Sequence, residues 1–143
     1  MFSQTIEYAL RAVLMLAARP GEALTAKDVA DRTQTPAHYL SKVMQELARA
    51  GVVRSQRGPR GGFRLARSPE QITMYDVVEA IDPLPRLRRC PLGIEGHEGL
   101  CPLHRRIDEA MAMVEQSFRA TTLAELLSAP GMATPLCAPG EQL

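Results

Sequence analysis

Apolar residues recur every three or four positions near the start of the chain, which is the spacing of one buried face of an α-helix. The apolar stripe consists of Ile6, Leu10, Val13, Leu14 and Ala17. Ser3 stands where an N-cap is needed, and Pro20-Gly21 follows as a stop signal. The pattern therefore predicts a helix over residues 3–18.

Two further helices are predicted close together. Thr25 is an N-cap with Asp28 three residues later, as in a capping box, and this helix is expected to end around Arg32-Thr33. The next is expected to begin at Thr35-Pro36, a cap followed by proline at the first helical position. Its apolar face is Leu40, Val43, Met44 and Leu47, and Gly51 ends it. Two short helices joined by about three residues predict a helix-turn-helix.

The pattern then changes to that of strands. Residues 52–55 begin with a β-branched pair, and residues 63–66 alternate between apolar and polar. Between them Arg57-Gly58-Pro59-Arg60-Gly61-Gly62 supplies three glycines and a proline. A strand, a glycine-rich turn and a second strand predict a hairpin. The hairpin directly follows the second helix of the helix-turn-helix, the recognition helix, and this position is typical of a wing.

Helical spacing returns in the second half of the chain. Thr73 is expected to cap a helix that ends at Asp82-Pro83, and a loop covers residues 84–100. Residues 102–119 predict a helix of about five turns, and Thr122 is expected to cap a short helix over residues 123–127. The long helix carries one apolar seam, made of Leu103, Ile107, Ala110, Met111, Val114 and Phe118.

These elements predict a mainly α fold with a small β-hairpin wing, a winged helix-turn-helix extended by a long dimerisation helix. We expect a DNA-binding domain over residues 1–82 and a sensor or cofactor loop over 83–101. The dimerisation helix and a short C-terminal helix follow over 102–128, and 129–143 form a flexible tail. The seam has no obvious partner within so small a domain, so pairing with a second chain is expected. The alternative is that this helix folds back on its own core.

The formal net charge is only +1, but the charges divide unevenly along the chain. Residues 1–67 hold eleven Lys and Arg against five Asp and Glu, whereas residues 68–143 hold six against eleven. Between Leu47 and Pro69 there are no acidic residues and six arginines. A one-sided basic stretch is typical of contact with a phosphate backbone, although a solvated basic face is the general alternative.

The recognition helix presents polar side chains near its start, where such helices reach base edges in the major groove. The expected DNA contacts are His38, Tyr39, Ser41 and Lys42 from this helix and Arg57 and Arg60 from the wing tip. The expected partner is thus a double-stranded DNA operator. The sequence contains no run of eighteen apolar residues, so no membrane span is predicted. Three widely spaced cysteines favour a reducing cytoplasm over a disulfide framework.

Several of these motifs resemble the family of bacterial regulators that includes the iron–sulfur cluster regulator IscR and the nitric-oxide-sensing repressor NsrR. The resemblance covers nearly all of residues 1–127. It rests on Tyr8-Ala9-Leu10-Arg11-Ala12, Tyr39-Leu40, Arg57-Gly58-Pro59-x-Gly61-Gly62, Phe63-x-Leu65, residues 76–81 and Cys101-Pro102-Leu103-His104. It implies a homodimeric transcriptional regulator, often a repressor, that contacts DNA around His38 and Arg57. Many members hold an iron–sulfur cluster in the loop before the long helix.

The sensing members of this family use three cysteines in that loop. This chain keeps Cys90 and Cys101, but residues 94–98 contain no cysteine. His97 and His104 add two imidazoles within the same stretch, so the ligand set suits either an iron–sulfur cluster or zinc. The resemblance also makes Glu7, from the partner chain, a candidate ligand. A reversible thiol pair or no cofactor at all are the alternatives.

The expected function is a homodimeric repressor that senses redox state, nitric oxide or iron–sulfur status through the Cys90–His104 loop. A cofactor-free winged-helix repressor, or a winged helix used as a protein-interaction module, is the alternative. An enzyme is not expected, because the glycines of the wing are not followed by the Gly-Lys-Ser/Thr of a phosphate-binding loop. Glu95 and Glu98 flank His97, yet nothing around them predicts a pocket.

Overall fold

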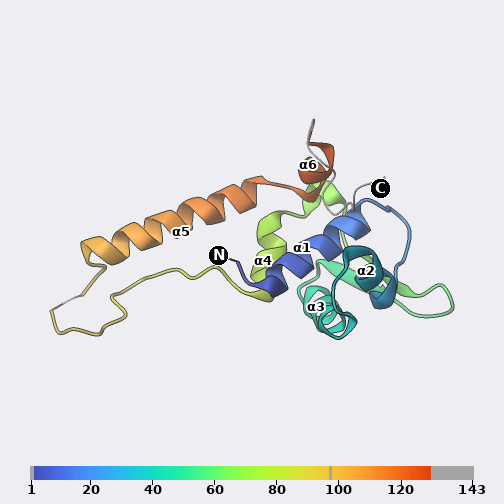
Figure 1. The fold of residues 1–143 in the computed structure, drawn as a ribbon. Helices are drawn as coiled ribbons and strands as arrows, with labels where there is room; N and C mark the ends of the chain where they lie inside the picture. Colours follow the sequence, from blue (N-terminus) through green and yellow to red (C-terminus); the bar gives the residue numbers. More distant parts are fainter. Residues whose placement is uncertain (1, 97, 130–143) are drawn as a thin grey trace.

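A computed structural model describes residues 2–96 and 98–129. The helices are α1 (Gln4–Ala17), α2 (Ala26–Thr33), α3 (Ala37–Arg49), the 3₁₀ turn η1 (Pro69–Gln71), α4 (Met74–Ile81), α5 (Pro102–Ala120) and α6 (Leu123–Ser128). The strands β1 (Val53–Gln56) and β2 (Gly62–Leu65) form an antiparallel hairpin. The predicted fold class, mainly α with a hairpin wing, is confirmed. The wing and α5 extend from opposite sides of a helical body (Figure 1).

Side-chain caps begin most of the helices where the sequence predicted them. Ser3 caps α1, and Thr25 and Thr73 each form a full capping box, with Asp28 and Asp76 respectively. Thr122 accepts from the Glu125 amide at the start of α6. Each cap satisfies backbone N–H groups that have no partner inside the helix.

The start of α3 differs from the prediction. Pro36 occupies the N-cap position and Thr35 makes no cap, so the helix begins at Ala37. The Thr35 hydroxyl is instead buried and accepts from the Thr33 hydroxyl at 2.9 Å. Thr33 and Thr35 thereby stabilise the turn between α2 and α3, which sets the angle between the two helices.

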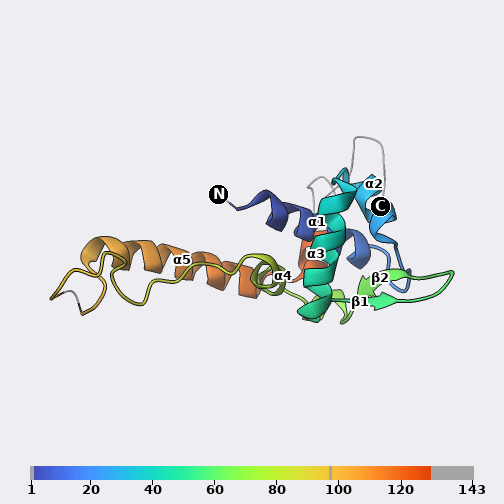
Figure 2. The same cartoon turned by 90° about the horizontal axis from the view of Figure 1, so that it is seen from below.

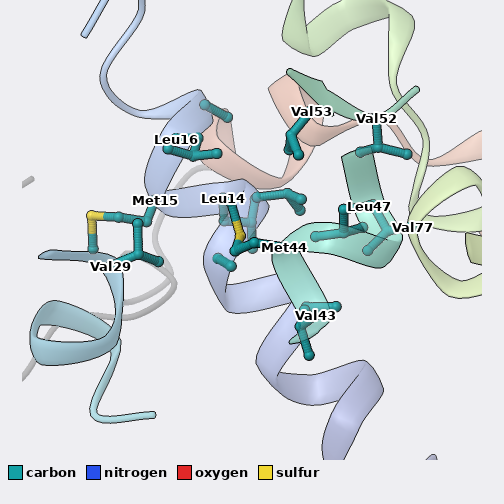
Figure 3. Close-up of a cluster of buried hydrophobic side chains, with 14 of the residues drawn as sticks. Leu14, Met15, Leu16, Val29, Val43, Met44, Leu47, Val52, Val53 and Val77 are labelled. Atoms are coloured by element: carbon teal, nitrogen blue, oxygen red, sulfur yellow. The ribbon is translucent and has the colours of Figure 1, made fainter. Parts of the chain in front are cut away.

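The apolar stripes of the helices meet in one core. α1 runs through its centre with Ala9, Ala12 and Val13 fully buried, and α3 adds the buried Leu40. Figure 3 shows two further core residues of α3, Met44 and Leu47. α4 packs against both α1 and α3. Because four apolar residues of α3 point inward, its rotation about its own axis is set by burial.

The hairpin pairs Val53 with Leu65 and Gln56 with Gly62, and its strands begin and end within one residue of the predicted ranges. Leu24 extends the sheet, since its backbone exchanges hydrogen bonds of 3.0 and 2.7 Å with Phe63. At Gly62, φ is +144° and an added Cβ would lie 2.5 Å from the Leu24 carbonyl. Only glycine permits this close approach.

After α5 the chain returns to the body. The backbone bonds Met74 N–H to Thr121 O and Leu123 N–H to Ile72 O, each 2.9 Å long, attach residues 121–123 beside η1 and α4. Leu123 is fully buried in the core. α6 thus packs as part of the body formed by α1–α4, which the sequence pattern did not indicate. Within the described ranges, every helix is too short or too polar to cross a membrane.

Candidate nucleic-acid interface and metal site

The first turns of α3 form the candidate base-reading surface. His38, Tyr39, Ser41 and Lys42 are all exposed, because the inward residues of the same helix hold the opposite face against α1. Figure 2 shows α3 lying across the front of α1, with the hairpin extending to one side. This is the arrangement that a major-groove helix and an adjacent wing require.

Aromatic contacts hold Tyr39 in place. Its ring centroid lies 4.6 Å from that of His38 and 6.3 Å from that of Tyr8 on α1, and half of the residue remains exposed. Ser41 donates to the Ala37 carbonyl at 3.2 Å, which leaves its oxygen as an acceptor. The helix therefore offers positioned hydrogen-bonding groups to a ligand on its outer side.

The wing tip presents two exposed guanidinium groups. Arg57 and Arg60 flank Gly58-Pro59, and a 2.9 Å bond from Gly61 N–H to Gly58 O closes the turn. Gly58 has φ of +108°, a conformation that glycine adopts without steric cost. The turn thus leaves both arginines exposed at the tip of the hairpin, and their contact with DNA stays a prediction.

Three predicted ligands converge at the opposite end of the molecule. The Sγ atoms of Cys90 and Cys101 and one ring nitrogen of His104 lie within 4.8 Å of one another. The His104 Nδ1 is 3.2 Å from Cys101 Sγ and 3.6 Å from Cys90 Sγ. Cys101 is the N-cap of α5 and His104 lies on its first turn, while the loop returns Cys90 to them as a buried thiol.

Of the two other predicted ligands, His97 and Glu7, the structure describes only Glu7. His97 lies outside the described residues, as do residues 130–143 of the expected tail and Cys137 within it. Glu7 pairs with Arg11 on α1, 3.0 Å away, and α1 lies in the body rather than at the remote end of α5 (Figure 1). Glu7 of the same chain is therefore not part of the site.

The donor set fits a transition-metal centre. Tetrahedral ligands at about 2.3 Å (sulfur) and 2.0–2.1 Å (nitrogen) from one ion lie roughly 3.5–4 Å from each other, close to the separations seen here. Iron–sulfur clusters also take thiolates, with histidine in place of some of them. Among the described residues only these three ligands converge, so a four-coordinate centre needs one more ligand.

The loop that carries Cys90 is attached to α5 by Arg86. Its guanidinium donates to Asp108 at 2.8 and 2.9 Å and to Glu115 at 3.1 Å, and the Leu87 amide also donates to Asp108 at 2.9 Å. These bonds lower the pKa of Asp108 to about 2. On the same helix, Arg119 bonds Glu115 and lowers the pKa of that carboxyl.

Arg119 continues this network to the body. Its guanidinium carbon lies 3.5 Å from the ring centroid of Tyr75 on α4, in a cation–π contact. Sequence inspection missed this group, because its ion pairs join residues more than twenty positions apart. No spacing rule links Arg86 to Asp108.

The predicted dimer seam divides into two parts. Leu103 and Ile107 are 64% and 44% exposed, whereas Met111 and Val114 line a groove of about 600 Å³ with Phe2 and Ile6. Phe118 packs against Phe2 with ring centroids 5.2 Å apart. No residue of α5 is fully buried. Met113 is 71% exposed and also belongs to the apolar surface of α5. The predicted seam does not include it, although it lies at helical spacing, three positions after the seam residue Ala110.

Comparison with known proteins agrees with the resemblance found in the sequence. The sequence model of the Rrf2 family, described as an iron-dependent transcriptional regulator, matches residues 2–129. The transcriptional regulator NsrR of Geobacillus kaustophilus is 36% identical over 126 residues, which cover 85% of each chain.

Solved structures of the same kind share the fold. CymR, the global cysteine regulator of B. subtilis, superposes with a TM-score of 0.74 at 26% identity, over 88% of this chain and 95% of its own. IscR of T. potens gives a TM-score of 0.76 over 94% and 93% of the two chains, and at 24% identity it supports the fold alone.

Proposed function

Since this chain belongs to the Rrf2 family of transcriptional regulators, we propose that it is a homodimeric repressor whose operator affinity responds to a metal centre at Cys90, Cys101 and His104. Membership makes the chain a bacterial DNA-binding transcriptional regulator and not an enzyme. The observation that carries the finer proposal is the convergence of two thiols and one imidazole at the exposed end of α5. We place the protein in the reducing cytoplasm, where thiolates persist.

Operator binding is assigned to α3 and the wing. Base contacts would come from His38, Tyr39, Ser41 and Lys42, and the arginines at positions 57 and 60 would follow the adjacent groove. The support is their shared exposure on elements whose inner faces are fixed by the core. A single such unit reads a half-site, so a two-fold dimer would double the recognised sequence.

Dimerisation is assigned to α5. The helix projects from the body, and Leu103, Ile107 and Met113 are left in solvent (Figure 1). Such an apolar surface is costly in an isolated monomer and typical of an interface. Glu7 of a second chain stays the candidate for the fourth ligand that the family resemblance implies.

The Arg86 network supplies a physical connection between the two functions. Arg86 holds the start of the loop between α4 and α5 against Asp108 and Glu115, and Cys90, four residues later, joins the triad. Arg119 and Tyr75 then connect α5 to α4, which packs on α3. An iron–sulfur cluster at the triad would supply sensitivity to redox state and nitric oxide. The cluster could change DNA affinity only if the dimer with the cluster and the dimer without it favour different spacings between the α3 helices of the two chains.

The test is to purify the protein without oxygen and to measure its visible absorption and its iron, acid-labile sulfide and zinc contents. Binding to DNA from upstream of its own gene is then measured before and after metal removal. Cys90→Ala, Cys101→Ala and His104→Ala should each lose the metal, whereas His38→Ala on α3, the matched control for His104→Ala, should keep it. If the anaerobically purified wild type contains no metal, and the triad variants bind the operator as tightly as it does, the proposal is wrong.

A further inference from the structure

Four arginines from separate parts of the chain line one pocket at the base of the wing. Arg19 follows α1, Arg54 lies on β1, Arg64 lies on β2 and Arg67 lies two residues after the end of β2. The pocket has a volume of about 240 Å³, and its apolar walls are Leu16, Ala17, Pro20 and Leu65. It is distinct from both the exposed face of α3 and the metal triad.

The positive charge of this pocket is only partly balanced. Arg19 has Glu22 at 3.7 Å, and Arg67 has Asp76 at 3.6 Å. Within the part of the chain that the structure describes, Arg54 and Arg64 have no ion-pair partner. These two residues are also directly opposite each other in the hairpin, and like charges in such a pair destabilise a sheet.

Hydrogen-bond donors in the same pocket lack acceptors. The Nε atoms of Arg19 and Arg64 are closed off from water, and neither finds an acceptor among the described residues. Buried N–H groups are almost always satisfied in native proteins, by the chain itself, by water or by a bound ion. Two unsatisfied guanidinium donors from different elements beside one pocket therefore indicate an exogenous acceptor.

We propose that this pocket binds a phosphate-class oxyanion, held mainly by Arg19 and Arg64. A tetrahedral oxyanion accepts from several directions, and the Nη–H groups of each guanidinium can bind it in pairs. The Nε–H groups could join only after the side chains turn, because both Nε atoms are closed off from water here. The negative charge of the anion would also offset the repulsion between Arg54 and Arg64. The volume of the pocket suits a small anion and not a drug-sized ligand.

The anion can come from two sources. One is a phosphate of the operator backbone, because Arg54 is three residues before Arg57, about 10 Å along the strand from the wing tip. The other is a free phosphate or phosphorylated small molecule. The first source rests on the proposed function, whereas the second does not depend on DNA binding at all.

Thermal unfolding and calorimetry with inorganic phosphate, at constant ionic strength against chloride, test the free anion. In chloride, Arg64→Gln should be at least as stable as the wild type, because it removes one charge of the opposed pair and one unsatisfied donor. Phosphate at about 100 times its Kd should raise the melting temperature of the wild type by about 10 °C. Arg64→Gln and Arg19→Gln should lose this rise, and the exposed wing variant Arg60→Gln should keep it.

Operator titrations of the same variants test the other source. If phosphate has no effect but Arg64→Gln and Arg19→Gln both lower the slope of log K against log salt by about 1, the pocket holds a backbone phosphate. If neither measurement separates these variants from wild type, the oxyanion site is wrong. A chain that binds no operator but shows the phosphate effect would refute the repressor function and keep the pocket.

Discussion

Arg86 and Asp108 form a two-point salt bridge, with Nε to Oδ1 at 2.8 Å and Nη2 to Oδ2 at 2.9 Å, between the loop after α4 and the long helix α5. A planar guanidinium facing a carboxylate in this way fixes orientation as well as distance. The loop that contains Cys90 is thereby held beside α5 without a metal ion at the triad.

Arg86→Gln should release this loop from α5. Exchange of the Leu87 amide hydrogen, which donates to Asp108, should become faster, and metal should be lost more readily from the triad. Hydrogen–deuterium exchange and metal release to a chelator measure the two effects. Arg106→Gln is the matched control, because it removes only an exposed pair with Glu109. Equal exchange rates in the two variants would contradict this role.

The same salt bridge predicts a pH dependence. The pKa of Asp108 is lowered from 3.8 to about 2, first by the Arg86 hydrogen bonds and then by the Leu87 amide. Its contribution to stability is therefore fully present above about pH 4 and is lost as the pH falls towards 2. The difference in free energy of unfolding between wild type and Arg86→Gln should be constant from pH 5 to 7 and should shrink below pH 4. A difference that persists unchanged at pH 2 would show that charge is not its cause.

Arg57→Ala should weaken operator binding and reduce the salt slope by about 1, because one phosphate or minor-groove contact is lost. Fluorescence anisotropy over a range of salt concentrations measures both. Arg105→Ala, an exposed arginine on α5, removes the same charge far from the wing and should leave the slope unchanged. An unchanged slope for Arg57→Ala would remove the wing from the DNA interface.

Ile107→Glu should convert a dimer to a monomer. The exposed isoleucine lies at the centre of the apolar surface of α5, and a buried unpaired carboxylate there is strongly unfavourable. Analytical ultracentrifugation at micromolar concentration gives the oligomeric state. Arg106→Glu adds the same group on the neighbouring exposed position and should remain dimeric. A variant at Ile107 that stays dimeric would place the interface elsewhere.

Leu123→Ala should cost about 2–5 kcal/mol of unfolding free energy, because it leaves a cavity in a fully buried site. Leu92→Ala, at a position 71% exposed, should change stability little. Urea unfolding of both variants measures the difference. A loss at Leu123 no larger than that at Leu92 would mean that α6 does not contribute to the core.

Local signals accounted for most of the elements. Capping boxes at Thr25 and Thr73 and the glycine-rich wing each depend on residues within a few positions of one another, so they can be read along the chain. The start of α3 was predicted one residue early, since a threonine before proline has the composition of a cap. Only the packed turn shows that the Thr35 hydroxyl bonds Thr33 instead.

The candidate sites divide in the same way. The exposed residues of α3 follow from helical periodicity, and Cys101 and His104 follow from their spacing at a helix start. Four other features join residues far apart in sequence. They are the approach of Cys90 to that pair, the Arg86–Asp108 bridge, the burial of Leu123 in the core and the arginine pocket. Periodicity determines which face of an element is buried, but not which distant element covers it. That choice is made by side-chain packing and ion pairing in three dimensions, so only the tertiary structure decided it.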